Sequence, residues 1–328
     1  MRLLTRSDIQ RAISMGDAVE ILKRAFAELS TGRANVPPRI VLPQNKHDGV
    51  TLVMPGYLFD SEALAVKVVS VHNRNPARNL PLIHALVLLL DPTTGQPLAA
   101  MEGSSLTALR TGAASGMATD LLARQDAKVA AIFGAGAQAR TQLLAIDAVR
   151  AIKCCWIYAR HPANVQRFIA KMQPQLSVEL LAAESPAQAV REAQIICAAT
   201  TSPTPVFDGA DLQPGTHINA IGSYQSSMQE IDGTTLQRAA KIVIDEYAGA
   251  LSEAGDLLMA MAQGAIQQTD IYGEIGEIAA GLKLGRETED EITYFKSVGN
   301  AVQDAAVAQA IYQRAVQEGL GIEIDFMS

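Results

Sequence analysis

The segment Val129-Ala-Ala-Ile-Phe-Gly-Ala-Gly-Ala-Gln-Ala139 decides the fold of this chain. Its first five residues are apolar and predict a short buried strand, and the residues that follow the segment predict a helix. Between the two lies a G-x-G-x-x-A turn. Gly134 permits the tight turn, Gly136 lets a pyrophosphate approach the backbone, and Ala139 lets the helix pack closely. Because the N–H groups of the helix would face that anion, the segment predicts the dinucleotide-binding turn of a Rossmann fold.

Alternation of strands and helices continues after this turn. The predicted strands are short apolar runs at 129–133, 155–158, 178–181, 195–198, 217–221 and 242–244. Six strands separated by helical or loop segments predict an α/β domain with a doubly wound parallel sheet. The glycine turn follows the first of these strands, which favours cofactor binding over a purely structural turn.

Residues at the carboxyl ends of the predicted strands are further candidates for binding the dinucleotide. Arg160 and His161 follow the second strand, near the spacing at which an acidic residue would hold the adenosine ribose. No acid is present there and Arg160 can meet a 2′-phosphate, so NADPH is favoured without excluding NADH; a solvated arginine is the alternative interpretation. The other candidates are Ala137 and Gln138 in the turn, and Thr200, Thr201, Ser202 and Gly222 in two later loops, where an ordinary loop role is an equal alternative.

The first hundred residues carry the pattern of antiparallel strands. Short β-rich runs alternate with turn clusters, and the predicted strands are 39–42, 51–55, 63–71 and 82–90. Two helices are expected before them, with Ser7 and Ser14 as their caps. This part of the chain therefore predicts a sheet-based first domain.

Two helices rich in small residues flank the dinucleotide-binding region. Residues 103–124 and 301–316 carry this pattern, and the second helix would fold back on the first domain. We therefore expect a discontinuous, mixed α+β domain over 1–117 with 301–328, and a Rossmann domain over 118–300.

The composition excludes several classes of protein. The 328 residues include 27 basic and 34 acidic side chains, and 48% of the chain is hydrophobic. This content excludes disorder, and the net charge of −7 argues against a nucleic-acid partner. The apolar stretch 83–90 is far shorter than the roughly 20 residues of a membrane helix. No signal peptide is visible, so we expect a cytoplasmic protein without a membrane partner. Cys154, Cys155 and Cys197 fit buried small hydrophobes better than a disulfide, and no metal site is expected.

Three cations in apolar or small surroundings are candidates for the substrate site. They are Arg39 in VPPRIVL, Lys67 in ALAVKVVS and Arg110 in SSLTALRTGAA. A cation inside a hydrophobic strand, as Lys67 is, costs free energy unless an anion or a hydrogen-bond network compensates it. For one isolated cation a structural ion pair or an edge strand is the commoner explanation. Three such cations in an acidic protein favour a cluster that binds a carboxylate.

Four segments of the sequence form a distinctive set: EGSSLTALRTGAA at 102–114, GAGAQA at 134–139, INAIG at 218–222 and DEITYFKSVGNAVQD at 290–304. Their resemblance is to the ornithine cyclodeaminase and mu-crystallin family. It implies a Rossmann domain and a substrate domain that also makes a homodimer, the latter built from the N-terminal half and the C-terminal helix. It also implies that Arg39, Lys67 and Arg110 contact a substrate carboxylate, in agreement with the cluster inferred from burial.

The family resemblance narrows the reaction. Cyclodeaminases carry an Asp for deamination shortly after the segment equivalent to 218–222, whereas this chain continues with Ser223 and Tyr224. Without that carboxylate, the acid/base group for deamination is missing. The resemblance therefore implies an oxidoreductase acting on CH–NH bonds, which reduces a small-molecule cyclic imine carboxylate with NADPH. Δ1-Pyrroline-2-carboxylate would give L-proline, and Δ1-piperideine-2-carboxylate would give L-pipecolate.

Roles within this reaction follow from the same resemblance. Arg39 and Arg110 would fix the carboxylate, and Lys67 would either share that anion or supply the imine proton. An ornithine cyclodeaminase, an alanine dehydrogenase and a non-catalytic, mu-crystallin-like protein that binds NADPH and a ligand are the alternatives.

Overall fold

The computed structural model of the chain describes residues 1–325, which form two compact units. Unit 1 comprises Met1–Arg110 together with the residues from Asn300 onward, and unit 2 comprises Thr111–Gly299. Helix α3 (Gly103–Leu122) runs from unit 1 into unit 2. The sequence placed these boundaries after residues 117 and 300, whereas the structure divides after 110 and 299.

Unit 2 is built on a parallel sheet, which confirms the α/β class. Its strands are β8 (Val129–Phe133), β9 (Cys154–Tyr158), β10 (Glu179–Ala182), β11 (Ile195–Ala198), β12 (His217–Ala220), β13 (Lys241–Ile244), β14 (Ile271–Glu274) and β15 (Thr293–Lys296). Their order is β10-β9-β8-β11-β12-β15-β13-β14, and every neighbouring pair is parallel.

The expected number of strands was wrong: within residues 1–325 this sheet has eight strands rather than six. The sequence prediction missed β14 and β15. Each has only four residues and contains charged or glycine positions, IYGE and TYFK, so neither shows a sustained apolar run. Strand β15 is the last of the sheet in the chain, and it lies between β12 and β13.

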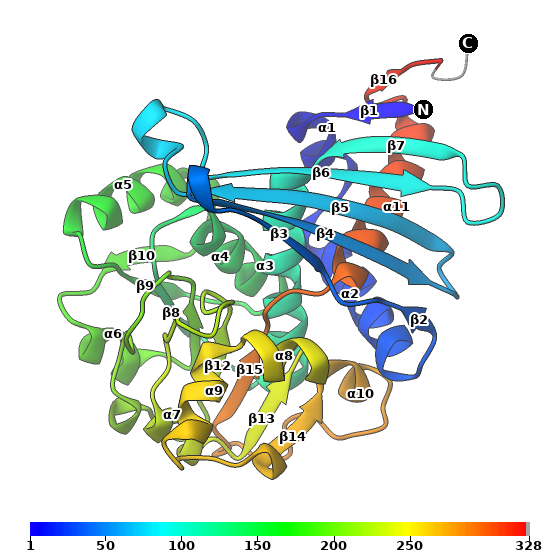
Figure 1. Ribbon diagram of the computed structural model, residues 1–328. Helices are drawn as coiled ribbons and strands as arrows, with labels where there is room; N and C mark the ends of the chain where they lie inside the picture. Colours follow the sequence, from blue (N-terminus) through cyan, green and yellow to red (C-terminus); the bar gives the residue numbers. More distant parts are fainter. Residues whose placement is uncertain (326–328) are drawn as a thin grey trace. The chain divides into compact units, whose positions relative to one another are not determined.

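Helices cover both faces of this sheet, as the doubly wound prediction requires (Figure 1). On β8, Ala130 and Ile132 pack toward α4 (Ala137–Val149) and α5 (Pro162–Met172). The alternate residues Ala131 and Phe133 join the opposite core. That second core is formed by α6 (Pro186–Glu192), α7 (Gly233–Arg238), α8 (Tyr247–Glu253) and α9 (Gly255–Ala262). The alternation of burial along the strand therefore produces two helical layers.

Unit 1 contains a mixed sheet in the order β16-β1-β7-β6-β5-β4-β2, with β3 paired to β4. The strands are β1 (Arg2–Leu4), β2 (Ala34–Asn35), β3 (Ile40–Gln44), β4 (Gly49–Leu58), β5 (Ala63–His72), β6 (Ile83–Leu90), β7 (Pro97–Glu102) and β16 (Ile322–Glu323). The four predicted antiparallel strands correspond to β3, β4, β5 and β6. Strand β1 pairs parallel to β7 and antiparallel to β16. Segments near both ends of the chain therefore join this sheet.

Unit 1 also contains the helices α1 (Arg6–Ala12), α2 (Met15–Ser30) and α11 (Ala301–Glu318). Ser14 caps α2 as predicted, in a capping box with Asp17. Ser7 does not cap α1. Thr5 takes that place because Asp8 lies three residues later and completes a second capping box. Helix α11 packs on α2, β4 and β5, so the last helix completes the first domain (Figure 1).

Short helical segments occupy the remaining turns. They are α10 (Ile275–Ala279) and the 3-10 turns η1 (Asn45–His47), η2 (Pro76–Arg78), η3 (Gln173–Gln175), η4 (Gly209–Asp211) and η5 (Gln268–Asp270). Among residues 1–325, no helix combines the length and apolar character needed to cross a membrane.

Candidate functional site

The glycine turn after β8 has the geometry that a dinucleotide site requires. Gly134 has φ +115°, and a Cβ there would lie 2.6 Å from the carbonyl oxygen of Ala199, so no other residue fits. Gly136 is the N-cap of α4, and a Cβ at this position would meet nothing within 4 Å. This open space lies in front of the first N–H groups of a 13-residue helix. Ala139 is fully buried beneath the turn. The turn therefore fits a pyrophosphate.

All of the residues predicted to bind the cofactor lie at one edge of the parallel sheet. Ala137 and Gln138 begin α4 after β8, and Arg160 and His161 follow β9. Thr200, Thr201 and Ser202 follow β11, and Gly222 follows β12. The strands β9, β8, β11 and β12 are consecutive neighbours and parallel, so their carboxyl ends lie together.

Lys67 occupies the buried face of a strand in unit 1. Along β5, the buried residues are Ala63, Ala65, Lys67 and Val69. The partners of Lys67 in the adjacent strands are Met54 on β4 and Val87 on β6, and both are buried. With 2% of its surface exposed, the ammonium group needs a compensating anion.

That anion is Asp304, which lies in the first turn of α11. The Lys67 Nζ donates to Asp304 Oδ2 at 2.5 Å. The Arg110 Nε lies 3.2 Å from Asp304 Oδ1, and the Arg110 guanidinium also donates to the side-chain oxygen of Gln303. We call Arg39, Lys67, Arg110 and Asp304 the carboxylate cluster. The sequence prediction missed Gln303 and Asp304, although both stand at the end of the segment 290–304. The only signal for them in the sequence is that an acidic residue occurs in a predicted helix made mostly of small residues.

Electrostatics in the carboxylate cluster favour a further anion. Burial lowers the pKa of Lys67 to about 8; the charge of Arg110 adds to this effect, Asp304 opposes it, and Arg39 lowers the pKa further. Arg39 itself is half-buried and directly precedes β3. Two buried cations face one buried carboxylate, so Lys67, Arg110 and Asp304 together keep one positive charge.

One buried donor beside the carboxylate cluster lacks a hydrogen bond among the described residues, namely Gln303 Nε2. Arg110 Nε makes no well-aligned hydrogen bond, but it is paired in charge with Asp304 Oδ1 at 3.2 Å. Buried N–H groups are nearly always hydrogen-bonded in native proteins. Together with the excess positive charge, the unpartnered N–H group of Gln303 fits a carboxylate ligand.

The sequence model of one protein family matches residues 1–319 of this chain, and this match decides the family assignment. This chain belongs to the ornithine cyclodeaminase/mu-crystallin family. The resemblance inferred from the four sequence segments is therefore confirmed, as is its combination of a Rossmann sheet with a mixed second sheet.

Relatives within this family carry several activities. A Δ1-pyrroline-2-carboxylate reductase of Bacillus cereus is 39% identical over 326 residues, which cover 99% of this chain and 100% of the relative. A solved Thermococcus litoralis Δ1-pyrroline-2-carboxylate reductase, in complex with NADH and L-proline, is 46% identical with a TM-score of 0.95; the match covers 99% of this chain and 100% of that one. An archaeal alanine dehydrogenase dimer with bound NAD is 35% identical with a TM-score of 0.92, covering 100% and 99%.

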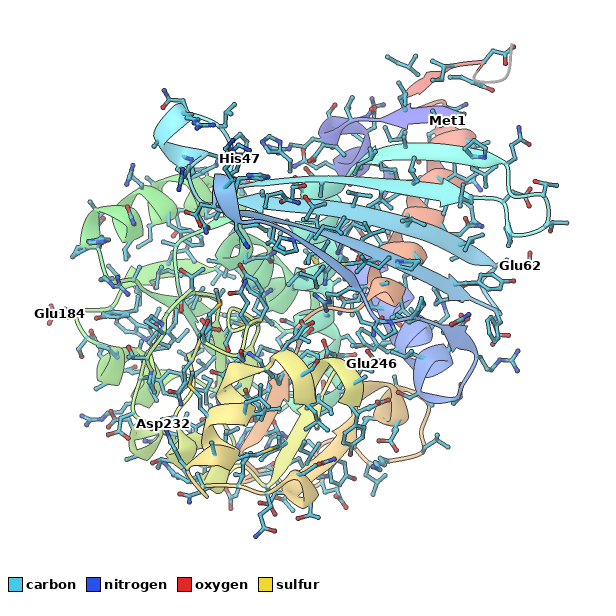
Figure 2. All side chains as sticks on the ribbon, in the orientation of Figure 1. Met1, His47, Glu62, Glu184, Asp232 and Glu246 are labelled. Carbon is cyan, nitrogen blue, oxygen red and sulfur yellow. The ribbon has the colours of Figure 1, made fainter. Side chains whose placement is uncertain are left out.

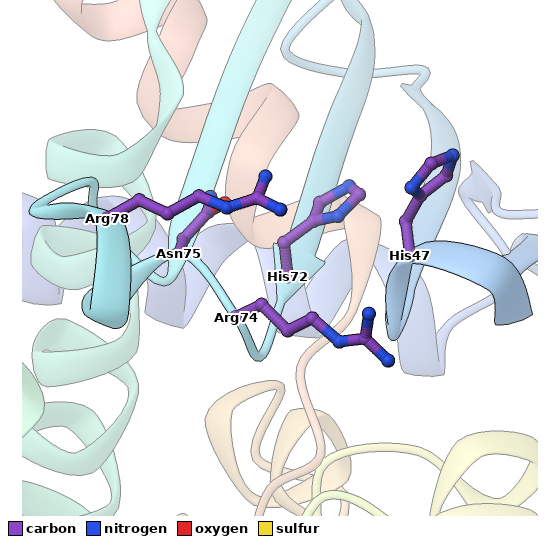
Figure 3. Close-up of a pocket in the computed structure, with 5 residues that line it drawn as sticks. All are labelled: His47, His72, Arg74, Asn75 and Arg78. Carbon is purple, nitrogen blue, oxygen red and sulfur yellow. The ribbon is translucent and has the colours of Figure 1, made fainter.

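Unit 1 also has an open pocket of about 310 Å³, away from the carboxylate cluster (Figure 3). It is lined by His47, His72, Arg74, Asn75 and Arg78, which come from η1, β5 and the turn before β6. In the view of Figure 3, the Arg78 side chain extends toward His72 and the Arg74 side chain runs below it. None of the predicted site residues lines this pocket.

Cys154, Cys155 and Cys197 are free thiols, and burial raises the pKa of Cys197 to about 12, which makes its thiolate inaccessible near neutral pH. Within residues 1–325, no group of three or more His, Cys, Asp or Glu residues is arranged to hold a metal ion.

Proposed function

We propose that this chain reduces cyclic imine carboxylates, converting Δ1-pyrroline-2-carboxylate to L-proline and Δ1-piperideine-2-carboxylate to L-pipecolate with a reduced nicotinamide cofactor. The observation that carries this proposal is the buried carboxylate cluster, which keeps one positive charge and has the unpartnered N–H donor of Gln303 beside it. The glycine turn supplies the second requirement, a dinucleotide site. Relatives at 39% and 46% identity that are named as this reductase support the same reaction.

The chain's own residues have defined tasks in this reaction. When bound, the reduced nicotinamide supplies a hydride to the imine carbon, and the imine nitrogen takes up a proton, which gives the secondary amine. Arg39 and Arg110 fix the substrate carboxylate. Asp304 accepts from Lys67 and contacts Arg110, and thereby orients both cations.

Lys67 is suited to two tasks. A pKa of about 8 means that the side chain is mostly an ammonium at neutral pH, yet it releases its proton more readily than an ordinary lysine. It therefore shares the carboxylate with the arginines or protonates the imine nitrogen. The two tasks differ in their response to Lys67→Arg, which keeps the charge but removes a titratable donor.

NADPH is the cofactor that we propose, with NADH accepted at lower efficiency. Arg160 and His161 follow β9 and are exposed, and neither position offers a carboxylate to a ribose hydroxyl. A guanidinium at this point can pair with a 2′-phosphate. The ratio of kcat/KM for NADPH and NADH tests the proposal, and a clear preference for NADH would refute it.

A substrate panel separates this function from its rivals. We expect NADPH oxidation with both cyclic imines. Oxidation with pyruvate plus ammonia instead would identify an alanine dehydrogenase. Release of ammonia from ornithine would identify a cyclodeaminase. Ligand binding without turnover of any cyclic imine would identify a binding protein.

We also propose that unit 1 binds the substrate and forms a homodimer through the sheet face opposite Lys67. Leu86, Val68, Val53 and Ile40 lie side by side across four strands on that face. Leu86 is 44% exposed and Ile40 is 55% exposed. An apolar row of this kind on a sheet face is typical of a protein interface. Sedimentation equilibrium tests the stoichiometry, and a monomer at micromolar concentration would refute it.

A further inference from the structure

One buried carboxylate joins the two loops that follow β11 and β12. Glu230 has none of its surface exposed. Its Oε1 accepts a hydrogen bond from the backbone N–H of Thr200 at 2.5 Å. Its Oε2 accepts from the N–H groups of Gly222 and Ser223, at 2.6 Å and 3.0 Å. Each oxygen therefore serves a different loop.

The Glu230 backbone is in turn fixed by a buried ion pair. Asp256 Oδ1 accepts from the N–H groups of Glu230 and Ile231, at 2.6 Å and 3.1 Å. Asp256 Oδ2 accepts from Lys296 Nζ at 2.7 Å, and both side chains are fully buried. Glu230 lies near the end of the connection between β12 and α7, and its backbone is thus held from α9 and β15.

The close approach of the two loops depends on this arrangement. A Cβ at Gly222 would collide with the backbone of Thr200 and would lie 2.6 Å from Glu230 Oε1. The loop after β12 therefore packs directly on the loop after β11, and the carboxylate satisfies the N–H groups at their junction. Buried N–H groups left without an acceptor would destabilise this geometry.

Burying this carboxylate is unfavourable in itself. Burial raises the pKa of Glu230 to about 7; the charge of Asp256 raises it further, whereas Lys296 and the hydrogen bonds from Thr200 lower it. The other titratable groups that face it are Cys197 on β11 and Tyr294 on β15, and both have raised pKa values and stay neutral near pH 7. Of Glu230, Cys197 and Tyr294, Glu230 is therefore the one whose pKa lies near neutral pH.

We propose that Glu230 is a positioning residue for the nicotinamide cofactor, because it holds the loops of Thr200 and Gly222 in the geometry that binds it. This inference rests on the proposed function, which assigns those two loops to the cofactor. Because Glu230 has no exposed surface, it would act through the backbone of the two loops.

The substitution Glu230→Gln tests this role. The amide has one acceptor oxygen, so one loop keeps its hydrogen bonds while the other meets an N–H group in place of an oxygen. We expect the dissociation constants of NADPH and NADH, measured by nicotinamide fluorescence, to rise by about 10- to 100-fold. We expect KM for the cofactor to rise with them, and kcat to change less.

The pH profile is a readout that a merely structural role would not produce. Protonation of Glu230 removes one acceptor, so cofactor affinity in the unaltered protein should fall as the pH drops through about 7. The apparent dissociation constant of the cofactor should then rise as the ionised fraction of Glu230 decreases. In E230Q this dependence should be absent.

Asp232 provides the matched control (labelled in Figure 2). Its carboxylate also accepts two backbone N–H groups, from Gly209 at 3.0 Å and Thr235 at 2.8 Å, but neither lies in the two loops. Asp232→Asn should lower the melting temperature and leave both dissociation constants unchanged.

The outcomes are distinct. If the unaltered protein binds neither cofactor, the proposed function and this inference both fail. If it binds the cofactor and folded E230Q binds equally well with the same pH profile, only the inference fails. If E230Q does not fold, the profile of the unaltered protein decides: an affinity that is constant through pH of about 7 overturns the inference.

Discussion

Replacing Lys67 by Met removes the ammonium from the carboxylate cluster while keeping the length of the side chain. Met is flexible and apolar, so it fits between Met54 and Val87 on the same face of the sheet. Asp304 loses its 2.5 Å hydrogen bond but keeps Arg110 at 3.2 Å. The loss of stability should therefore stay below the ~3–5 kcal/mol of a buried charge left without any partner.

The effect on activity follows from the charge of the cluster. Lys67, Arg110 and Asp304 together carry one positive charge, and Lys67→Met reduces it to zero. A substrate carboxylate about 4 Å away then loses an attraction of about 4 kcal/mol at an effective dielectric constant of about 20. This loss corresponds to a decrease of about 1000-fold in kcat/KM.

Steady-state oxidation of NADPH with Δ1-pyrroline-2-carboxylate measures this decrease, and thermal unfolding checks that the variant folds. Lys241→Met is the control. Lys241 is also buried, and its Nζ lies 2.5 Å from a Glu287 carboxylate oxygen, but it begins β13 in unit 2. It should lower the melting temperature and leave kcat/KM unchanged. A folded K67M enzyme with full activity would refute the role of Lys67.

Four further predictions concern the carboxylate cluster, the cofactor and the proposed dimer. Asp304→Asn leaves both cations without their anion, so we expect a lower melting temperature and a fall in kcat/KM of about 10-fold or more. A melting temperature and a kcat/KM equal to those of the unaltered protein would contradict the orienting role of Asp304. Because the pKa of Lys67 is lowered to about 8, its ammonium is present below this pH and is lost above it, so kcat/KM should fall as the pH rises through about 8. The same fall in K67R would show that another group titrates. Arg160→Asp should lower the NADPH/NADH ratio of kcat/KM by about 10-fold or more, and an unchanged ratio counts against the 2′-phosphate contact. Leu86→Asp places a charge in the apolar row and should yield a monomer by light scattering; a persistent dimer would place the interface elsewhere.

The parts of the fold that sequence predicts well are local. The turn at 129–139 is readable because its strand, glycines and helix are contiguous, and Gly134 does take a positive φ. The capping box at Ser14 is equally local. Strand β15 cannot be predicted in this way, because it has only four residues, one of them Lys. These residues form a strand only because they pair with β12 on one side and β13 on the other.

The candidate site shows the same division. Lys67 is conspicuous in the sequence, because a cation in an apolar strand must be compensated. Its partner is not conspicuous. Asp304 lies 237 residues away, and only the packing of α11 on β5 brings the two together. Glu230 is similar, since its three N–H donors belong to loops that meet only after the parallel sheet has formed.

The most direct test of the proposed reaction is NADPH oxidation by the purified protein with Δ1-pyrroline-2-carboxylate and with Δ1-piperideine-2-carboxylate, alongside ornithine and pyruvate plus ammonia. We predict turnover of the cyclic imines, with L-proline and L-pipecolate as products, and no release of ammonia from ornithine. Absence of NADPH and NADH oxidation with either imine, while one of the other substrates turns over, would contradict the assignment.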